Sequence, residues 1–402
     1  MSLLVFNAGS TSLKFAVYDL ATGVPSAVAR GGIEPLDERA VLHLAQGADE
    51  TRRPQPVDGI RPAVRACLEL LAQTVFKEHP VTVLAHRLVY GEPGMGEFAH
   101  IDEPLLERLR KYVSLAPLHE QAEIDVIHAC AGELGRELPA YAAFDTGFYC
   151  ELPPAASTYA IPPGLGERFG IRRSGFHGFA HRSMLEGYCA AAGARPSQAR
   201  IVSFQLGGGC SVTAIDRGRP VETSMGYTPL EGLVMATRSG DLDAGIIFEC
   251  LRKGMAVDEL YEILERDSGL KGLSGIGSDM RRLLAEAERG HAGAGLALDV
   301  YCHRARKYLG AYLAVLGGAD AVVFGGGVGE HAGQIRTRIC DGFEWCGLKL
   351  DEAANRRPVS RPQCISAPQS KIGVYVVPVD EESVIAREVL RVSRGGVAAA
   401  QS

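Results

Sequence analysis

The chain alternates between short apolar runs and segments with helical spacing, and turns of small residues close several of the apolar runs. Short apolar runs bounded by turn residues predict buried strands. Their alternation with helical segments along the whole chain predicts an α/β architecture built in layers. The stretch 43–59 is polar and contains two prolines, so it predicts a surface loop.

One pattern, an apolar strand followed by a turn of small residues, occurs three times. Residues 3–20 read LLVFNAGSTSLKFAVYDL and residues 201–218 read IVSFQLGGGCSVTAIDRG, and both predict a β-hairpin with a turn free of bulky side chains. The third copy, AVVFGGGVGEHAG at 321–333, precedes a segment at 334–340 that predicts a helix. Repetition after about 200 residues predicts a duplicated domain rather than a solenoid, with the two copies facing each other across a cleft.

These turns have the composition of an anion-binding site. Glycine and serine let backbone N–H groups approach a phosphate, hydroxyls add donors, and Lys14 adds a positive charge to the first turn. No GxxxxGK[ST] loop is present, and the third turn lacks the βαβ context of a dinucleotide fingerprint. Simple closure of a hairpin is the alternative for each turn, but three such turns in one chain favour phosphate binding.

Composition narrows the class of protein. The chain has 402 residues, 46% of them hydrophobic and 22% charged, which is typical of a soluble globular protein with two domains. A net charge of −6 disfavours a general nucleic-acid binder. The nearly uncharged stretch 308–329 is interrupted by glycines and predicts a helix, a turn and a buried strand rather than a membrane span, and the N-terminus has no basic segment of a signal peptide. Ten scattered cysteines without a CxxC pair predict reduced, mostly buried thiols in a cytoplasmic protein.

Several titratable or charged side chains occur inside apolar or glycine-rich segments. They are His86, Arg87, His119, Asp145, His177, His181, Arg238, Asp241, Asp243, Asp380, Glu381 and Glu382. A buried arginine requires an anionic partner, which makes Arg87 and Arg238 candidates for binding a substrate. The spacing of His177 and His181 would suit zinc on a helix, but no third ligand is evident. Glu381 can equally be a first-turn helix residue, and Asp145 a turn or capping residue.

Taken together and in order, the motifs resemble those of the acetate kinases, the acetokinase branch of the sugar kinase, heat-shock chaperone and actin superfamily. The motifs extend from Asn7 to about Arg387 and are NAGSTSLK, HRLVYG, APLH, FDTGF, YAIP, GIRRSGFHG, VETSMGYTPLEGL, TRSGDLD, SGIGSDMR, GGGVGE and DEESVIAR. The resemblance implies an α/β fold of two duplicated actin-like (ribonuclease H-like) domains around a central cleft. Residues 1–149 with a returning helix at 382–396 would form the first domain. Residues 150–381 would form the domain for nucleotide binding and dimerisation.

The same resemblance implies reversible phosphoryl transfer from ATP to acetate, giving acetyl phosphate and ADP. It implies Mg²⁺ as the metal, with Mn²⁺ as the alternative ion, and a cytoplasmic homodimer without a nucleic-acid or membrane partner. Phosphoryl transfer requires in-line positioning and positive charge around the transferred group, which two arginines, a histidine, a lysine and a metal ion would supply.

The resemblance also implies roles for the matching residues. The catalytic set would be Arg87, His119, Asp145, His177 and Arg238, with Arg87 also binding substrate, and Asn7 and Glu381 would organise the metal. Val89, Leu118, Phe176 and Pro229 would enclose the acyl methyl group, with plain core packing as the alternative. The nucleotide would contact Ser10, Ser12, Lys14, Gln205, Leu206, Gly207, Gly208, Gly209, Asp279, Met280, Arg281, Gly327, Val328, Gly329, Glu330 and His331. Acetate has no carboxyl proton near neutral pH, so Asp145 is expected to orient an arginine or metal-bound water rather than act as a base.

The chain departs from the family pattern mainly on the nucleotide side. Gln205 and Gly208 replace the usual histidine and asparagine of the second turn, and His331 replaces the usual asparagine after the third. Further departures are Tyr90-Gly91-Glu92 and Val379-Asp380-Glu381-Glu382. These changes leave ATP, GTP and pyrophosphate as donors to be distinguished.

Two alternative functions remain. The volume of the pocket near Val89 and Pro229 would separate an acetate kinase from a propionate or butyrate kinase. A nucleotide-binding regulator of the same superfamily is the alternative from another class. Retention of Arg87, Asp145, His177 and Arg238 argues against the regulator, which would not need these groups around a transferred phosphoryl group.

Overall fold

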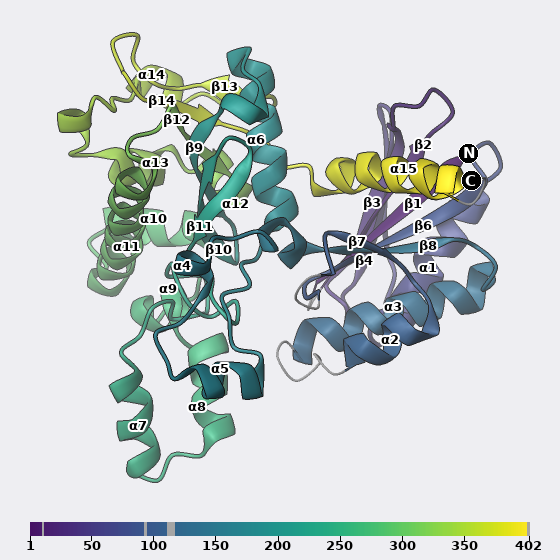
Figure 1. Cartoon of the computed structure of the whole chain (residues 1–402), viewed down its shortest axis with the longest axis horizontal. Coiled ribbons are helices and arrows are strands. Elements are labelled where there is room, and N and C mark those ends of the chain that lie inside the picture. The colour runs from purple at the N-terminus through teal and green to yellow at the C-terminus, as the bar shows by residue number, and fades with distance from the viewer. Residues whose placement is uncertain (10–11, 92–94, 111–116, 400–402) are drawn as a thin grey trace. The chain divides into compact units, whose positions relative to one another are not determined.

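The computed structural model describes residues 1–9, 12–91, 95–110 and 117–399, except for the side chains of 117–120 and 394–399. Contacts between residues divide the chain into two compact units (Figure 1). Unit 1 comprises Met1–Cys150 and Asp380–Ser402, and unit 2 comprises Glu151–Val379. Each unit is built on one mixed β-sheet with helices against its faces.

The sheet of unit 1 has the strand order β5-β4-β3-β2-β1-β6-β8-β7. Its strands are β1 (Ser2–Ala8), β2 (Leu13–Asp19), β3 (Ser26–Glu34), β4 (Val41–Gln46), β5 (Asp49–Pro54), β6 (Val81–Leu88), β7 (Phe98–His100) and β8 (Ala140–Phe144). The helices of this unit are α1 (Ile60–Gln73), α2 (Glu103–Leu109), α3 (Pro117–Leu134), the 3₁₀ helix η2 (Asp145–Tyr149) and α15 (Glu381–Ala399). β1, β6 and β8 run parallel, whereas β1 to β5 form an antiparallel meander.

Successive side chains of β1 point to opposite faces of the sheet, and the strand is apolar on both because helices cover both. Leu4, Phe6 and Ala8 belong to the core that α1 and α3 cover. Helix α15 packs against β1, β2 and β6 on the other face (Figure 1). That face ends in Asn7, whose side chain contacts the start of α15. The alternation therefore directs the polar residue at the strand end towards the first turn of the C-terminal helix.

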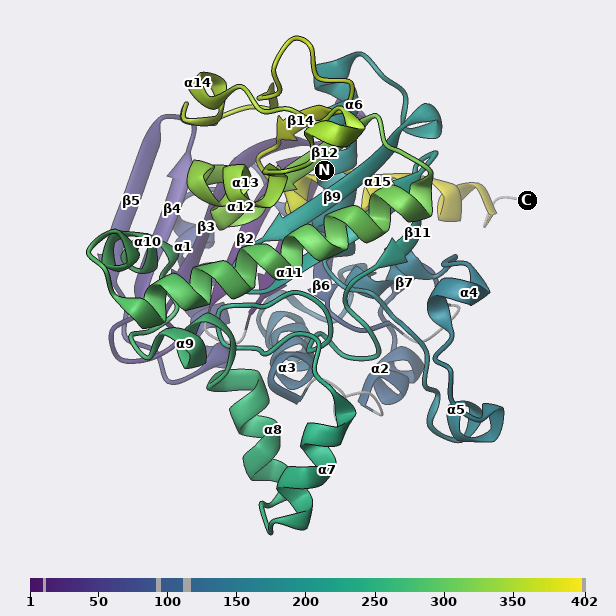
Figure 2. The same ribbon diagram turned by 90° about the vertical axis from the view of Figure 1, so that its left-hand side faces the viewer.

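The sheet of unit 2 has the order β11-β10-β9-β12-β14-β13. Its strands are β9 (Arg200–Leu206), β10 (Cys210–Asp216), β11 (Arg219–Thr223), β12 (Ala321–Gly325), β13 (Gln363–Cys364) and β14 (Gly373–Val376). Its helices are α4 (Pro154–Ser157), α5 (Pro163–Phe169), α6 (Gly178–Ala192), α7 (Ala244–Arg252), α8 (Val257–Arg266), α9 (Gly269–Ser274), α10 (Met280–Glu288), α11 (Ala292–Leu316), α12 (Gly326–His331), α13 (Gly333–Cys340) and α14 (Glu352–Asn355), with 3₁₀ helices η3 (Pro196–Gln198) and η4 (Glu344–Cys346). α11 crosses one face of the sheet, and α6 covers the other (Figures 1 and 2).

The two sheets repeat one topology. In each, an antiparallel three-stranded meander is followed by two parallel strands: β3-β2-β1-β6-β8 in unit 1 and β11-β10-β9-β12-β14 in unit 2. Both predicted hairpins are present, as β1–β2 and β9–β10, and the third glycine turn joins β12 to α12. The prediction of a duplicated α/β fold is therefore confirmed.

The prediction of a loop at residues 43–59 is wrong. Val41–Gln46 and Asp49–Pro54 form the hairpin β4–β5 at the edge of the first sheet, with Gly47 at φ 59° in its turn. β5 is almost entirely exposed because it has a neighbour on one side only. An exposed edge strand does not need apolar residues, and its charged side chains discourage pairing with a second chain. The polar sequence of β5 therefore did not indicate a strand.

The interpretation of two other sequence features is confirmed. Residues 308–329 contain the end of α11, the buried strand β12 and most of α12, and no helix in the described part of the chain is long and apolar enough to cross a membrane. All ten cysteines are free, and six of them are buried. Their burial raises thiol pKa values, as for Cys302 to about 11, which keeps them protonated and unreactive.

Candidate functional site

In unit 1, pairing of parallel strands brings polar side chains to one strand end. Asn7 on β1 is the register partner of Arg87 on β6, so both side chains emerge on the same face of the sheet. Helix α15 begins beside them, and Asn7 Nδ2 donates to Glu381 Oε2 at 3.2 Å and to Glu382 Oε1 at 3.3 Å. Lys14, the antiparallel partner of Asn7 on β2, is exposed at the same edge. The first turn and the C-terminal helix thus share one polar cluster.

Arg87 is the centre of this cluster. Its side chain is 11% exposed, and its Nη2 donates to Oδ2 of the buried Asp145 at 2.8 Å. Nη1 reaches Asn7 Oδ1 at 3.4 Å, and Nε lies 3.6 Å from Glu381 Oε2. That last distance is too long for a hydrogen bond, and Nε is a buried donor without a partner among the described residues. The guanidinium is therefore held in place by Asp145 and Asn7.

The cluster has more carboxylates than cations. Burial raises the pKa of Glu381 to about 7, Arg87 opposes that rise, and the nearby Asp145 and Glu382 reinforce it. No three His, Cys, Asp or Glu side chains within the described residues are arranged to hold a metal by themselves. Mg²⁺ usually takes one or two carboxylates and completes its shell with water and phosphate oxygens. Asn7 and Glu381 fit such a partial donor set because a cation there would offset the excess negative charge.

Glu123 is a residue of this cluster that the sequence did not reveal. It lies on α3, is 1% exposed, and accepts a hydrogen bond from the Val89 N–H at 3.0 Å through Oε2. Its Oε1 is buried without a partner among the described residues. Burial raises the pKa of Glu123 to about 8, against the attraction of Arg87. The only signal in the sequence was a glutamate between apolar positions of a helix, which is a common pattern.

Because the pKa of Glu123 is raised above that of an unfolded glutamate, the folded protein binds more protons than the unfolded chain between pH 4.5 and about 8. Stability must therefore fall as pH rises through that window. We expect Glu123→Gln, which keeps an acceptor for Val89 N–H, to reduce this slope by up to about 1.4 kcal/mol per pH unit. Urea unfolding at pH 5, 7 and 8.5 measures the slope, and parallel lines for parent and variant would contradict the prediction.

His86 has a different place from its neighbour Arg87. It points to the opposite face of the sheet, where its ring stacks on Phe6 with ring centroids 6.1 Å apart. Burial lowers its pKa to about 3, so it is neutral at physiological pH. His86 is a core residue of unit 1.

In unit 2, the second turn lies against a histidine and an arginine. His177 precedes α6 in the left-handed conformation, φ 58°, which is uncommon for a residue with a side chain. A Cβ atom built on Gly209 would lie 3.2 Å from His177 Nε2 and 3.7 Å from Arg238 Nη1. The imidazole and the guanidinium therefore meet at the glycine that closes the turn. A larger residue at 209 would fill the space between them.

Contacts with Pro229 and Glu265 fix the Arg238 side chain. Nη1 donates to the Pro229 carbonyl oxygen at 3.0 Å, and Nε forms an ion pair with Glu265 Oε2 at 3.3 Å. Both charged side chains are largely buried, with exposed fractions of 19% and 13%. Glu265 lies at the end of α8 and was not singled out in the sequence. Its carboxylate contacts Nε, while Nη1 lies on the side of Gly209 in the second turn.

The second and third turns are in contact through Gly326. This residue has φ 75°, and a Cβ atom there would lie 2.7 Å from the Leu206 carbonyl oxygen and 2.9 Å from Gln205 Oε1. Glu330 Oε1 accepts from the Gly326 and Val379 N–H groups at 3.1 Å each. Gln205 Oε1 is buried without a hydrogen-bond partner among the described residues. Glu330 thus braces the third turn, while Gln205 lies at the junction of both turns.

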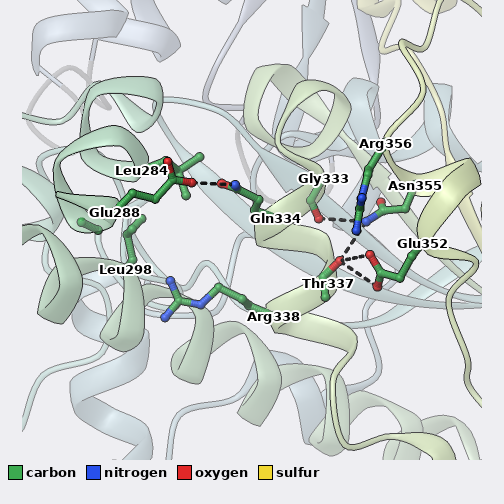
Figure 3. A pocket seen from close by; sticks show the side chains of 11 residues that line it. Leu284, Glu288, Leu298, Gly333, Gln334, Thr337, Arg338, Glu352, Asn355 and Arg356 are labelled. Carbon is green, nitrogen blue, oxygen red and sulfur yellow. Dashed lines mark hydrogen bonds between the residues drawn. The ribbon is translucent and has the colours of Figure 1, made fainter. Parts of the chain in front are cut away.

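One of two adjoining hollows in unit 2 reaches the nucleotide candidates Glu330 and His331, whereas Asp279, Met280 and Arg281 line neither hollow. Asp279 caps α10 by accepting from the Arg282 N–H at 3.0 Å, Met280 is buried, and Arg281 is 93% exposed. One hollow of about 550 Å³ is lined by Leu284, Ala287, Glu288, Leu298, Gly333, Gln334, Thr337, Arg338, Glu352, Asn355 and Arg356 (Figure 3). The second, of about 400 Å³, shares five of these residues and reaches Glu330 and His331. Pockets of this size accommodate small organic molecules.

Some predicted site residues belong to different units, and others lie outside the described part of the chain. Val89 and Phe176 are buried, and they belong to different units, as do Val89 and Pro229. Ser10 lies outside the described residues. The backbones of Leu118 and His119 belong to α3, but their side chains lie outside the described part of the chain. Ser12 contributes its carbonyl oxygen, which accepts from the Gly9 N–H at 2.8 Å and closes the first turn.

Comparison with known proteins decides the family. The model of the acetokinase family matches residues 2–387. The chain belongs to the acetokinase family. Members are kinases that transfer a phosphoryl group to a carboxyl group and generally require a divalent metal, so the predicted family and enzyme class are confirmed.

Acetokinase relatives match this chain over nearly its whole length. It is 40% identical over 407 residues to an acetate kinase of Solibacter usitatus, covering 97% of this chain and 98% of that one. It resembles the crystal structure of a Porphyromonas gingivalis acetate kinase with a TM-score of 0.86 and 32% identity, covering 96% and 98% of the two chains. A propionate kinase from Francisella tularensis gives a TM-score of 0.88 at 31% identity with the same coverage. Both acid specificities therefore occur among similar structures.

Proposed function

We propose that this acetokinase transfers a phosphoryl group reversibly between ATP and acetate, forming acetyl phosphate and ADP. The observation that carries the proposal is the meeting of His177 and Arg238 at Gly209 in the second turn. A phosphoryl group held by that turn would have an imidazole and a guanidinium beside its oxygens. Phosphoryl transfer is accelerated mainly by such positioning and charge stabilisation.

In this proposal Arg87 binds the carboxylate of the acid. Asp145 and Asn7 hold its guanidinium in place, and 11% of the side chain stays exposed for contact with an acceptor. Asp145 then acts as an orienting group, since the acid has no proton to give up near neutral pH. His119 would support the phosphoryl site, and Val89, Leu118, Phe176 and Pro229 would enclose the acyl group.

Asn7 and Glu381 would hold Mg²⁺, with Mn²⁺ as the alternative ion. A bound divalent ion supplies charge neutralisation for the phosphate oxygens. The side chains of this chain then have to orient the acid and the transferred group. Asn7 is itself positioned by the carboxylates at the start of α15, which fixes its amide relative to Arg87.

For the nucleotide, we propose that residues 205–209 and 327–331 contact the phosphates and the adenosine, with Asp279, Met280 and Arg281 beside the ribose and base. The hollow that reaches Glu330 and His331 supports this assignment. Ser10, Ser12 and Lys14 would contact the phosphate end from the first turn. The exposed Lys14 has the charge and reach for that role.

We also propose a cytoplasmic homodimer that associates through unit 2. Helices α7 and α8 project from the rest of that unit (Figures 1 and 2). They expose Ile246, Phe248, Val257 and Tyr261, with Phe248 57% exposed. Clustered apolar side chains on a surface favour association, and the molar mass in solution tests it.

The acid and the donor are tested together by measuring acyl phosphate as its hydroxamate. Acetate, propionate and butyrate are each combined with ATP, GTP and pyrophosphate in the presence of Mg²⁺. We expect the highest kcat/KM for acetate with ATP. Faster turnover with propionate would assign the chain to the propionate kinases, whereas turnover only with GTP or pyrophosphate would show that Gln205 and His331 change the donor. No acyl phosphate from any pair would contradict the proposed reaction.

A further inference from the structure

Behind His177, unit 2 contains a continuous chain of buried hydroxyl and imidazole groups. His177 Nδ1 lies 2.9 Å from Ser211 Oγ on β10. The same hydroxyl lies 2.8 Å from His181 Nε2, and His181 Nδ1 lies 2.9 Å from Ser203 Oγ on β9. Ser203 Oγ in turn donates to Met184 Sδ at 3.7 Å. His181, Ser203 and Ser211 are each fully buried.

The fold builds this chain from two elements. His177 and His181 lie one helical turn apart at the start of α6, and their rings extend towards the sheet. Ser203 and Ser211 lie on the antiparallel strands β9 and β10, on the face that α6 covers. Cys210, the next residue on β10, contacts Tyr301 of α11 on the opposite face. The serines therefore take the place of apolar residues where the sheet meets α6.

The proton count on His181 limits how the chain can be arranged. Burial lowers the pKa of His181 well below its usual range, so this ring is neutral and has one N–H. If the His181 proton is on Nδ1, it donates to Ser203 Oγ, and Nε2 accepts from the Ser211 hydroxyl. Ser211 Oγ is then an acceptor for His177 Nδ1–H. If the proton is on Nε2 instead, the order reverses, and the Ser211 hydroxyl donates to an unprotonated His177 Nδ1.

Only the first arrangement is compatible with a charged His177. An imidazolium has protons on both nitrogens, so its Nδ1 needs an acceptor. In that arrangement every hydroxyl in the chain both accepts and donates, because Ser203 completes it with its bond to Met184. His177 Nε2–H is then directed to the side of the ring where Gly209 and Arg238 lie.

We propose that Ser203, His181 and Ser211 are positioning residues that hold His177 as an imidazolium with its Nε2–H facing the transferred phosphoryl group. This inference rests on the proposed role of His177 in phosphoryl transfer. Ser211 Oγ accepts a hydrogen bond from Nδ1–H of the charged ring. This bond stabilises the imidazolium against repulsion by Arg238, the cation on the other side of Gly209. Glu265, which pairs with Arg238, reduces that repulsion further.

Ser211→Ala removes the acceptor of the Nδ1 proton. A hydrogen bond to the charged form of a group favours that form, so its loss must lower the pKa of His177. We expect kcat to fall roughly tenfold to a hundredfold, with the KM for acetate nearly unchanged. The alkaline limb of the kcat–pH profile should move to lower pH. Ser211→Thr, which keeps the hydroxyl, should restore that limb.

The matched control is Ser224→Ala. Ser224 is also a buried serine beside β10, but its hydroxyl accepts from the Val212 N–H instead of facing an imidazole. Ser224→Ala should lower stability without moving the pH limb. Ser203→Ala, at the far end of the chain, should move the limb in the same direction as Ser211→Ala by a smaller amount.

Histidine NMR of the resting protein provides a readout that does not depend on turnover. ¹⁵N labelling of histidine, with His177 assigned by comparison with His177→Gln, gives the pKa and tautomer of His177 in the parent and in the variants. A lower pKa in Ser211→Ala without a change in kcat would support the hydrogen-bond chain and contradict the catalytic role of His177. An unchanged pKa together with an unchanged pH limb would overturn the inference.

Discussion

Arg238→Ala should lower kcat by about 10³-fold to 10⁵-fold while the protein stays folded, the range that arginines contribute in other phosphoryl-transfer enzymes. The reason is the position of the guanidinium, 3.7 Å from a Cβ atom built on Gly209 and held by Glu265 and the Pro229 carbonyl. In this variant, a phosphoryl group at the second turn would no longer have the fixed positive charge of the guanidinium beside it. Initial rates at saturating ATP and acetate measure the effect, and circular dichroism checks the fold.

Two further variants sharpen this prediction. One separates charge from geometry, and the other is a surface control. Arg238→Lys keeps the charge but loses the planar fork, so it should recover only part of the rate. Arg252→Ala removes an arginine that is 76% exposed on α7 and lies 4.0 Å from Glu249. Exposed pairs of this kind contribute little, so its rate should equal that of the parent. Near-parental turnover of Arg238→Ala would contradict the assigned role.

Much of the fold was predictable because its signals are local. A buried strand between two helical layers must be apolar, and a turn that a phosphate approaches must be bare, so each copy of the motif was visible at 3–20, 201–218 and 321–333. β5 was missed because an edge strand has no such requirement, whereas the inner strand β4 does alternate, with Leu42 and Leu44 in the core. The apolar pattern indicates burial, so the exposed strand β5 could not be predicted from it.

The candidate site was predictable in its charged residues but not in the groups that hold them. Arg87 and Asp145 were conspicuous because charge rarely occurs at a buried strand end. Glu123 and Glu265 lie on helices, where a glutamate is ordinary, and only the packing of the helix decides whether it is buried. Ser211 was hidden for a related reason, since a serine next to a cysteine in a strand does not reveal which face it points to.

Arg87→Leu should lower the free energy of unfolding by about 3–5 kcal/mol, as expected when one partner of a buried ion pair is removed. Asp145 would remain buried at 1% exposure without its 2.8 Å donor, and Glu381 would lose the cation that opposes the rise of its pKa. Glu381 can avoid the uncompensated charge only by binding a proton. The loss of stability should therefore be larger at pH 8 than at pH 5, and urea unfolding at both values measures it.

The matched control for Arg87→Leu is Arg61→Leu in the same unit. Arg61 Nη2 lies 2.8 Å from Asp125 Oδ1, the same distance as in the buried pair, but the Arg61 side chain is 66% exposed. Water can solvate Asp125 once its partner is gone, so the loss should stay within about 1 kcal/mol and should not depend on pH. If both variants lost the same free energy at both pH values, burial would not distinguish the two pairs. The Arg87 cluster would then be an ordinary surface ion pair rather than a group of charges held out of water for a substrate.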